Sequence, residues 1–387
     1  MNHLINPNES RILENAGDRM PIGLMSIAAN TPDTKVFDLN HMSWNDYMNE
    51  FDRDKPEAVG VSVYTSASMP DAVQIAKCLK GETYLIAGGH HATHMPETLI
   101  PYFDSVVLGE GENSFGTAQP GIVERNAPDL SAINKPVGNL SLYGMNMDGK
   151  KTGTIITSRG CPYHCAFCGK LEDKVRFHKI DDVLSQVDDF KSAGYEAIYF
   201  LDDVFTIKEK RMKTIVQTMN MPFRVTTRAN LVNPNKLETL AENGCEWLSL
   251  GIESGDDDIL AKSQKEMTTK DNYNAVYNAT KAGIKTKGFF IIGLPGETEE
   301  TARKTINFTK TLREYAGLTQ ADFYFLTPFP GTPIWKDPDK FGINIRDKDF
   351  TKYLEAGKGA HCVVDTESLK AERIEELVEE AKDLWKN

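Results

Sequence analysis

The sequence lacks an apolar run close to the ~20 residues that a membrane-spanning helix requires. Its first residues, MNHLINPNES, lack a basic stretch followed by an apolar core, so no secretory leader is expected. Lys and Arg are dispersed among acidic residues, and the net charge is −12, which argues against a broad nucleic-acid-binding surface. Low-complexity segments are missing as well. These absences predict a cytoplasmic globular protein without a membrane or nucleic-acid partner.

Cysteine is scarce, with six residues in a chain of 387. A chain of this length does not need disulfides for stability, and the cytoplasm keeps thiols reduced. Three cysteines are scattered, and we expect each to be a small buried side chain: Cys78, Cys245 and Cys362. The other three, Cys161, Cys165 and Cys168, lie together in the stretch SRGCPYHCAFCGK. This concentration of thiols is the strongest functional signal in the sequence.

The first third of the chain alternates short apolar runs with helical patterns. Strands are expected in HLINPN, KVFDLN, AVGVSVYT, TYLIAGGH and SVVLGEGE, with amphipathic helices between them. This alternation predicts an α/β domain over residues 1–115, with a Rossmann-like open parallel sheet. Such a sheet binds ligands beyond the carboxyl ends of its strands, and here those ends are rich in Gly, Ser, Thr and His.

Residues 116–150 are rich in Gly, Pro and Asn and are predicted to be a linker with little regular structure. Six strand–helix units then follow over residues 151–335, which predicts a partial (β/α)6 barrel. Residues 336–387 form an expected helical extension that ends in the charge-laced helix SLKAERIEELVEEAKDLWKN. Barrels of this kind carry their chemistry at the carboxyl ends of the strands, where the cysteine-rich stretch also lies.

Three thiolates on one tight loop suit a soft metal. A structural zinc ion would need a fourth ligand, and no second cysteine pair follows at zinc-ribbon spacing. A ferredoxin-type [4Fe–4S] cluster uses four cysteines, so three would leave one iron open to an external ligand. A zinc site remains the alternative at this point.

The spacing Cys161-x3-Cys165-x2-Cys168, with aromatic Phe167 before the last cysteine, resembles the signature of the radical S-adenosylmethionine (SAM) superfamily. The resemblance implies that a [4Fe–4S] cluster binds SAM at its open iron and generates a 5′-deoxyadenosyl radical. Asp202 or Asp203 in YFLDD would hold the SAM amino group, and Arg228 would pair with the SAM carboxylate. The remaining implied SAM contacts come from GIESG, the glycine motif and LTPFPGTP: Glu253, Ser254, Gly293 and Thr327.

The front domain is similar to the cobalamin-binding domain of the cobalamin-dependent radical SAM class. This similarity implies cobalamin as a further cofactor, although the Asp-x-His-x-x-Gly pattern that supplies an axial histidine in cobalamin mutases is missing. The implied cobalamin contacts are Thr65, Ser66, Gly88, Gly89, His90, His91, Gly109, Glu110 and Gly111. The methylthiotransferases, which also combine an α/β domain with such a barrel, are excluded because this front domain holds only Cys78.

The function implied by the two resemblances is methyl transfer from methylcobalamin to an unactivated carbon of a small molecule, after hydrogen abstraction by the adenosyl radical. An external donor such as flavodoxin or ferredoxin would supply the electron. One alternative is a radical SAM cyclase, ring-contracting enzyme, oxidoreductase or isomerase without methyl transfer. Another is a non-catalytic iron–sulfur regulator.

Overall fold

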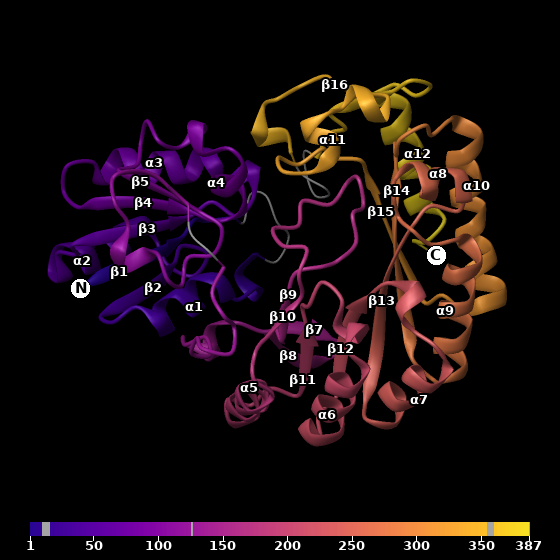
Figure 1. The fold of residues 1–387 in the computed structure, drawn as a ribbon, viewed down its shortest axis with the longest axis horizontal. Helices are drawn as coiled ribbons and strands as arrows, with labels where there is room; N and C mark the ends of the chain where they lie inside the picture. The colour runs from indigo at the N-terminus through magenta and orange to yellow at the C-terminus, as the bar shows by residue number, and fades with distance from the viewer. Residues whose placement is uncertain (10–15, 125–126, 354–359, 387) are drawn as a thin grey trace. The chain divides into compact units, whose positions relative to one another are not determined.

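The computed structural model describes residues 1–9, 16–124, 127–353 and 360–386. The chain forms two units, Met1–Met145 with Asp349–Gly359, and Asn146–Lys348 with Ala360–Asn387 (Figure 1). Parts of the front domain (10–15), of the expected linker (125–126) and of the expected extension (354–359 and 387) lie outside the described residues. Within the described ranges, no helix is both long and apolar enough to cross a membrane.

The first unit is built on a six-stranded sheet of order β2-β1-β3-β4-β5-β6. Every neighbouring pair in it is parallel. The strands are β1 (Asn2–Asn6), β2 (Thr34–Asp38), β3 (Ala58–Ser62), β4 (Tyr84–Gly88), β5 (Ser105–Leu108) and β6 (Gly121–Glu124). The open parallel sheet expected from the alternating pattern is confirmed.

Side chains alternate across this sheet and build one apolar core on each face. Leu4, Ile86 and Val107 pack with Leu24 of helix α1 (Ile22–Asn30). Their strand neighbours, such as Ile5, Leu85, Ala87 and Val106, belong to the opposite core. That core is closed by α2 (Trp44–Asp54), α3 (Met69–Leu79) and α4 (His90–His94). Because both faces are covered, the strands consist of nearly continuous apolar residues.

The predicted linker contains more regular structure than its composition suggested. β6 extends the first sheet by pairing with β5, and β7 (Met145–Met147) is the edge strand of the second sheet. The alternating burial of β6, with Ile122 half exposed, is that of a short edge strand. Gly and Pro on either side of these strands hid them in the sequence pattern.

A segment from far along the chain completes the first unit. The short helical turn η10 (Phe350–Lys352) packs on the turn η2 (Ser66–Ser68) and on α3. The Phe350 ring lies edge-on to the His91 ring, with a centroid distance of 4.9 Å, and Tyr353 is fully buried. The region expected as a C-terminal extension is therefore divided between the two units.

The second unit contains a seven-stranded sheet of order β15-β14-β13-β12-β11-β8-β7. Six strands are parallel and follow chain order: β8 (Lys150–Ile155), β11 (Ala197–Phe200), β12 (Phe223–Thr227), β13 (Cys245–Glu253), β14 (Lys285–Ile292) and β15 (Gln320–Phe325). The sheet does not close, since β7 and β15 are its edges. This is the partial (β/α)6 barrel that the repeated strand–helix pattern predicted.

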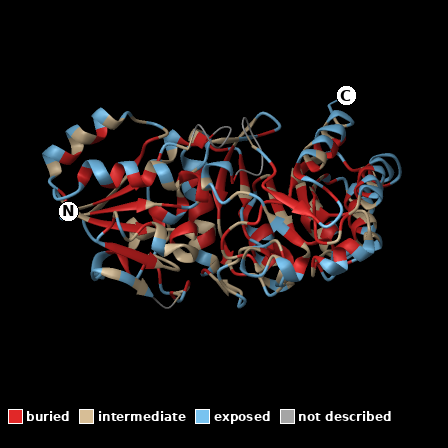
Figure 2. Cartoon of the chain, turned by 90° about the horizontal axis from the view of Figure 1, so that it is seen from above, coloured by how far each residue is buried: buried red, intermediate tan, exposed pale blue. Residues whose placement is uncertain are grey.

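Helices follow the strands of the second unit and cover the outer side of its curved sheet (Figure 1). They are α5 (Ile180–Ser192), α6 (Glu209–Met219), α7 (Pro234–Glu242), α8 (Asp257–Lys262), α9 (Thr269–Lys281) and α10 (Glu299–Thr311). The last helix, α12 (Ala371–Asp383), buries Ile374, Leu377 and Val378 and contacts β15 and β14. Figure 2 shows the result: buried strands flanked by helices whose outer faces are exposed. The predicted packing of the C-terminal helix on the barrel is confirmed.

The two-faced core of the first unit makes a direct stability prediction. Leu4 is 1% exposed in the core beneath α1, whereas Ile122 on β6 is 50% exposed. Leu4→Ala should lower the free energy of unfolding by about 2–5 kcal/mol because it leaves a cavity. The matched control Ile122→Ala should change it by about 0.5 kcal/mol or less. Urea unfolding followed by circular dichroism measures both, and equal effects of the two substitutions would contradict the assigned core.

Candidate functional site

The three clustered cysteines lie on a loop that leaves the carboxyl end of β8. The loop is closed at its base by the antiparallel pair β9 (Ser158–Arg159) and β10 (Arg176–Phe177). Gly160 stands at the entry with φ +96°, and a Cβ at this position would lie 2.5 Å from the carbonyl oxygen of Lys174. Only glycine fits this crossing of two backbones.

Two adjacent carboxylates at the end of β11 anchor the base of the loop. Asp202 is buried and accepts hydrogen bonds from the backbone N–H of Thr157 and from the hydroxyls of Thr157 and Ser158, each at 2.6 Å. Asp203 accepts from the Gly160 N–H at 3.1 Å. Burial raises the pKa of both carboxyl groups. The structure thus brings both predicted residues to the cysteine loop. Both carboxylate oxygens of Asp202 accept hydrogen bonds that position this loop.

Lys170 ties the loop together from inside. Its ammonium donates to the carbonyl oxygen of Cys161 at 2.8 Å and to that of Tyr163, and it pairs with Asp173 at 2.8 Å. Three N–H groups meet three oxygen acceptors, so the ammonium is fully satisfied. Sequence reasoning did not single out Lys170, although it stands two residues after the last cysteine of the quoted stretch.

The pKa of the Cys168 thiol is raised within this loop. Although part of Cys168 reaches solvent, partial removal from water raises its pKa first, and Cys165 and Cys161 add to the increase. In the described part of the chain, no three Cys, His, Asp or Glu side chains are grouped closely enough to hold one metal ion. A [4Fe–4S] cluster held by three cysteines would bind each thiolate at a different iron.

Arg228, at the end of β12, is a buried cation beside this loop, with 5% of its surface exposed. Each of its three nitrogens donates to a protein group: to Cys165 Sγ at 3.2 Å, to the carbonyl oxygen of Lys265, and to Asn230 at 3.4 Å. The guanidinium also lies on the Tyr163 ring, 3.7 Å from its centroid. Among the described residues, Arg228 forms no ion pair with a carboxylate, which is unusual for a buried cation.

Glu253 and Lys265 form a buried ion pair of 2.8 Å next to the cysteine loop. Glu253 has φ +68°, rare for a side chain of this type, and the ladder between β13 and β14 shifts register at this point. Gly251 leaves room for the pair, because a Cβ there would lie 2.5 Å from the Glu253 carboxylate. Lys265 also lies 5.6 Å from the ring centroid of Phe167. Sequence reasoning missed Lys265, since no local pattern marks a contact twelve residues away.

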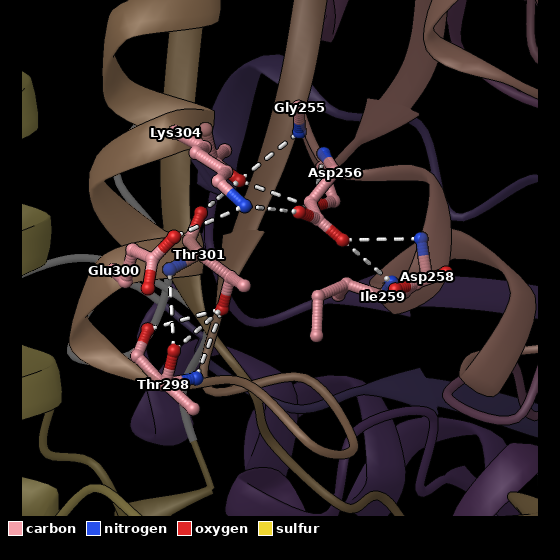
Figure 3. A network of polar contacts seen from close by, with 10 residues as sticks. Gly255, Asp256, Asp258, Ile259, Thr298, Glu300, Thr301 and Lys304 are labelled. Carbon is pink, nitrogen blue, oxygen red and sulfur yellow. Dashed lines mark hydrogen bonds and ion pairs between the residues drawn. The ribbon is translucent and has the colours of Figure 1, made fainter.

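Ser254 and the residues after it connect the end of β13 to helix α10. The Ser254 hydroxyl is buried and lies 3.0 Å from that of Thr305, which also accepts from the Gly255 N–H. Figure 3 shows the adjoining network, in which Asp256 caps α8 and pairs with Lys304 at 3.3 Å. The capping Thr298 of α10 lies in the same network. Ser254 therefore has partners within the protein.

The ends of β14 and β15 hold two buried oxygen atoms that lack hydrogen-bond partners among the described residues. One is the hydroxyl of Thr327 and the other is Oε1 of Glu297. The second oxygen of Glu297 accepts from the N–H groups of Gly293, which has φ +93°, and Leu294. An unsatisfied hydroxyl at the sixth strand end is the feature expected where a polar ligand is to bind.

In the first unit, His91 is held between two hydroxyls. Its Nδ1 lies 2.9 Å from Ser66 Oγ and its Nε2 lies 3.0 Å from Thr98 Oγ1. Burial lowers the pKa of His91 to about 4, so the ring is neutral. Thr65 accepts from the Ser68 N–H and shapes the turn after β3. The rings of His90 and His94, at the two ends of α4, lie edge-on with a centroid distance of 4.7 Å.

At the same edge of the sheet, a glycine lets the backbone after β4 approach the backbone after β3, and Thr93 links the loops after β4 and β5. Gly89 has φ +111°, and a Cβ there would lie 2.8 Å from the Val63 carbonyl oxygen. Thr93 joins the two loops by donating to the Gly89 carbonyl and accepting from the Gly109 N–H. The position of Gly88 is not crowded in this way, because a Cβ there would have no atom within 4 Å. Glu110 and Gly111 come directly after Gly109 in the chain, and Gly111 faces Ile27 of α1. An open edge lined by backbone suits a large flat cofactor.

Two of the three scattered cysteines are buried and one is exposed. Cys245 and Cys362 are buried as predicted, and the Cys362 thiol donates to the Val364 carbonyl. The prediction for Cys78 was wrong, since this residue is exposed near the end of α3. Its neighbours Ala76 and Leu79 occupy the buried face of that helix instead.

Comparison with known proteins agrees with both halves of this geometry. The profile of the radical SAM superfamily matches residues 155–309, and that of the B12 binding domain matches residues 11–118. An uncharacterized methyltransferase of Pyrococcus horikoshii is 31% identical to this chain, over 85% of the chain and 81% of the relative. The chain belongs to the cobalamin-dependent class of the radical SAM superfamily. Membership implies a [4Fe–4S] cluster, SAM and cobalamin as the cofactors of this radical SAM enzyme.

Two further similar proteins have names that state a function. The hopanoid C-3 methylase of Methylococcus capsulatus is 24% identical over 95% of this chain and 76% of the relative. The radical SAM methyltransferase TsrM from Kitasatospora setae, solved with cobalamin and a [4Fe–4S] cluster bound, is similar in structure with a TM-score of 0.71. That likeness covers 90% of this chain and 77% of TsrM at 19% identity, so it shows the shared fold.

Gly160→Ala tests the anchoring of the cysteine loop. The added methyl group would clash with the Lys174 carbonyl, so the loop should open and the reconstituted radical SAM enzyme should lose most of its iron. The control is Gly194→Ala, at φ +79° with no atom within 4 Å of the new Cβ. It should keep its iron and lose about 1–2 kcal/mol of stability. Iron and sulfide analysis measures the difference, and full iron in the Gly160 variant would refute the constraint.

The buried Glu297 predicts a pH dependence of stability. Burial raises the pKa of its carboxyl group from 4.5 to about 8. Between these values the unfolded chain has released the proton while the folded protein keeps it. The free energy of unfolding therefore falls as pH rises through this window, by at most about 1.36 kcal/mol per pH unit. Glu297→Gln should remove this decline. Melting temperatures of the two proteins at several pH values test it, and parallel curves would contradict the assignment.

Proposed function

We propose that this enzyme is a cobalamin-dependent radical SAM C-methyltransferase that acts on a small molecule. When bound, the cluster with SAM supplies a 5′-deoxyadenosyl radical for hydrogen abstraction, and methylcobalamin supplies the methyl group. The observation that carries the proposal is the cysteine loop at the end of β8, anchored by Asp202 and Asp203, in a chain that also contains a cobalamin-binding domain. The methyltransferase relatives support the choice of methyl transfer over other radical outcomes.

The residues at the strand ends divide into ligands and supports. Cys161, Cys165 and Cys168 would bind the cluster, and Asp203 would lie near the SAM amino group. The buried, unpartnered hydroxyl of Thr327 and the backbone at Gly293 would meet the adenine, with Phe167 and Glu253 completing the SAM site. Orientation is the main contribution of such a site, because it holds reacting groups in one geometry and excludes water.

The cobalamin site is proposed at the edge formed by the ends of β3, β4 and β5. Gly88, Gly89, Gly109 and Gly111 would admit the cofactor close to the backbone. Thr65, Ser66, His90, His91 and Glu110 would supply polar edges. His91 has both nitrogens engaged by hydroxyls, so it would support this loop and not bind cobalt.

The substrate is proposed to lie against the inner face of the second sheet. Lys287, Phe289 and Ile291 of β14 are partly exposed and alternate with buried residues that face the helices. Lys287 pairs with Asp322 at 2.5 Å, and Tyr324 donates to the same carboxylate at 3.2 Å. These polar and aromatic groups suit a small molecule that has both polar and aromatic parts.

We also propose a cytoplasmic location. We propose flavodoxin or ferredoxin as the electron source, since no second cysteine cluster accompanies the first.

Cys168→Ala tests the radical function. Anaerobically reconstituted enzyme with SAM, hydroxocobalamin and dithionite should form 5′-deoxyadenosine, and also S-adenosylhomocysteine as cobalamin is methylated. Loss of one cluster ligand should abolish 5′-deoxyadenosine, because no source of electrons reaches SAM. The control Cys78→Ala changes an exposed thiol of the first unit and should leave both products unchanged. Chromatography with mass detection measures them.

The same assay separates the alternatives. Deoxyadenosine without any S-adenosylhomocysteine would favour a radical SAM cyclase, oxidoreductase or isomerase over a methyltransferase. Neither product under strong reductant would favour a non-catalytic iron–sulfur protein. Cluster and corrin absorption bands in the same purified sample would support both cofactors independently of turnover.

A further inference from the structure

We propose that Arg228 is a positioning residue that sets the reduction potential of the cluster through Cys165, and is not the group that binds the SAM carboxylate. The inference rests on the proposed function because it requires the [4Fe–4S] cluster. It departs from the role that the sequence resemblance implied for this arginine.

The first support is the contact itself. Arg228 Nη1 donates to Cys165 Sγ at 3.2 Å, and Cys165 is the most buried of the three cluster cysteines. Hydrogen bonds to the ligating sulfurs are one of the factors that fix the potential of an iron–sulfur cluster. A charged donor strengthens such a bond.

The second support is that the guanidinium is held in place. Its Nη2 donates to the Lys265 carbonyl, its Nε donates to Asn230, and one of its faces lies on Tyr163. Tyr163 belongs to the cysteine loop, so the cation and the loop are fixed to each other. Three of its five N–H groups, one on each nitrogen, are thus used within the protein, which fixes the orientation of the guanidinium toward Cys165.

The third support is charge. In the described part of the chain, the nearby carboxylate Glu253 is paired with Lys265, and Arg228 has no carboxylate partner. A buried cation without an anion is costly. Thiolates bound to a cluster supply that negative charge, and one-electron reduction adds more of it. The fixed cation therefore stabilises the reduced form more than the oxidised form, which raises the potential.

Arg228→Gln tests the proposal in the full-length enzyme, with Arg228→Lys as the variant that keeps the charge. In a spectroscopic redox titration without SAM, the Gln variant should show a reduction equilibrium constant about tenfold smaller, equal to ~59 mV for one electron. The Lys variant should shift less. The affinity of the oxidised protein for SAM, measured by equilibrium dialysis, should stay within threefold of wild type in both.

The matched control is Arg224→Gln on the same strand. Arg224 donates to Ser249 and lies on the Tyr199 ring, and among the described residues it forms no hydrogen bond with a cysteine. Its loss should leave the potential unchanged. An equal shift in this control would overturn the proposal, because it would show a general effect of charge.

Each other outcome is decisive. An unchanged potential with SAM affinity at least tenfold weaker would assign Arg228 to the SAM carboxylate and overturn the proposal. No change in either quantity would overturn it too, as would failure of both Arg228 variants to take up iron, which would indicate a purely structural role. A wild-type protein that shows no cluster signal at all would instead refute the proposed function.

Discussion

The attachment of the cysteine loop to the end of β11 is the constraint on which the second unit depends. A loop of this length has no regular structure of its own to fix three thiols. Asp202 removes that freedom by holding Thr157 and Ser158, and Asp203 holds Gly160. The carboxylates come from a neighbouring strand of a parallel sheet, whose spacing is rigid. The rigid sheet thus determines the positions of the three thiols, through the hydrogen bonds that Asp202 and Asp203 make with the loop.

Buried and partly buried charges are concentrated around the same loop. Lys170 lies inside it, Arg228 lies against one thiol, and the Glu253–Lys265 pair lies beyond. Such groups are expensive to remove from water, and a fold keeps them only where surrounding groups compensate. The left-handed conformation of Glu253 adds local strain. These destabilising features are located where cofactor chemistry is proposed. This placement agrees with the general observation that functional sites reduce the stability of a protein.

The fold was largely predictable because its strands are β-branched apolar runs and its helices are amphipathic, and both signals are local. The cysteine spacing was predictable for the same reason. Contacts made through turns were not: Lys265 pairs with Glu253 at the point where Glu253 takes φ +68° and the ladder between β13 and β14 shifts register. The motif was enough to predict that Asp202 lies at the site. Its hydrogen bonds with Thr157 and Ser158 could not be predicted, because they depend on the direction in which the side chain points. Composition did not indicate β6 and β7 within the predicted linker, because such short edge strands are stabilised by pairing with neighbouring strands.

The turn at Phe350–Lys352 has a consequence for how the polypeptide is made. It belongs to the first unit, yet it is synthesised about two hundred residues after Met145. Domains generally fold as units while the ribosome works, at about 5–20 residues per second. His91 and its surroundings must therefore wait roughly 10–40 seconds for the Phe350 ring that covers them. The first unit therefore leaves the ribosome without this turn and acquires it only after about two hundred further residues have been synthesised.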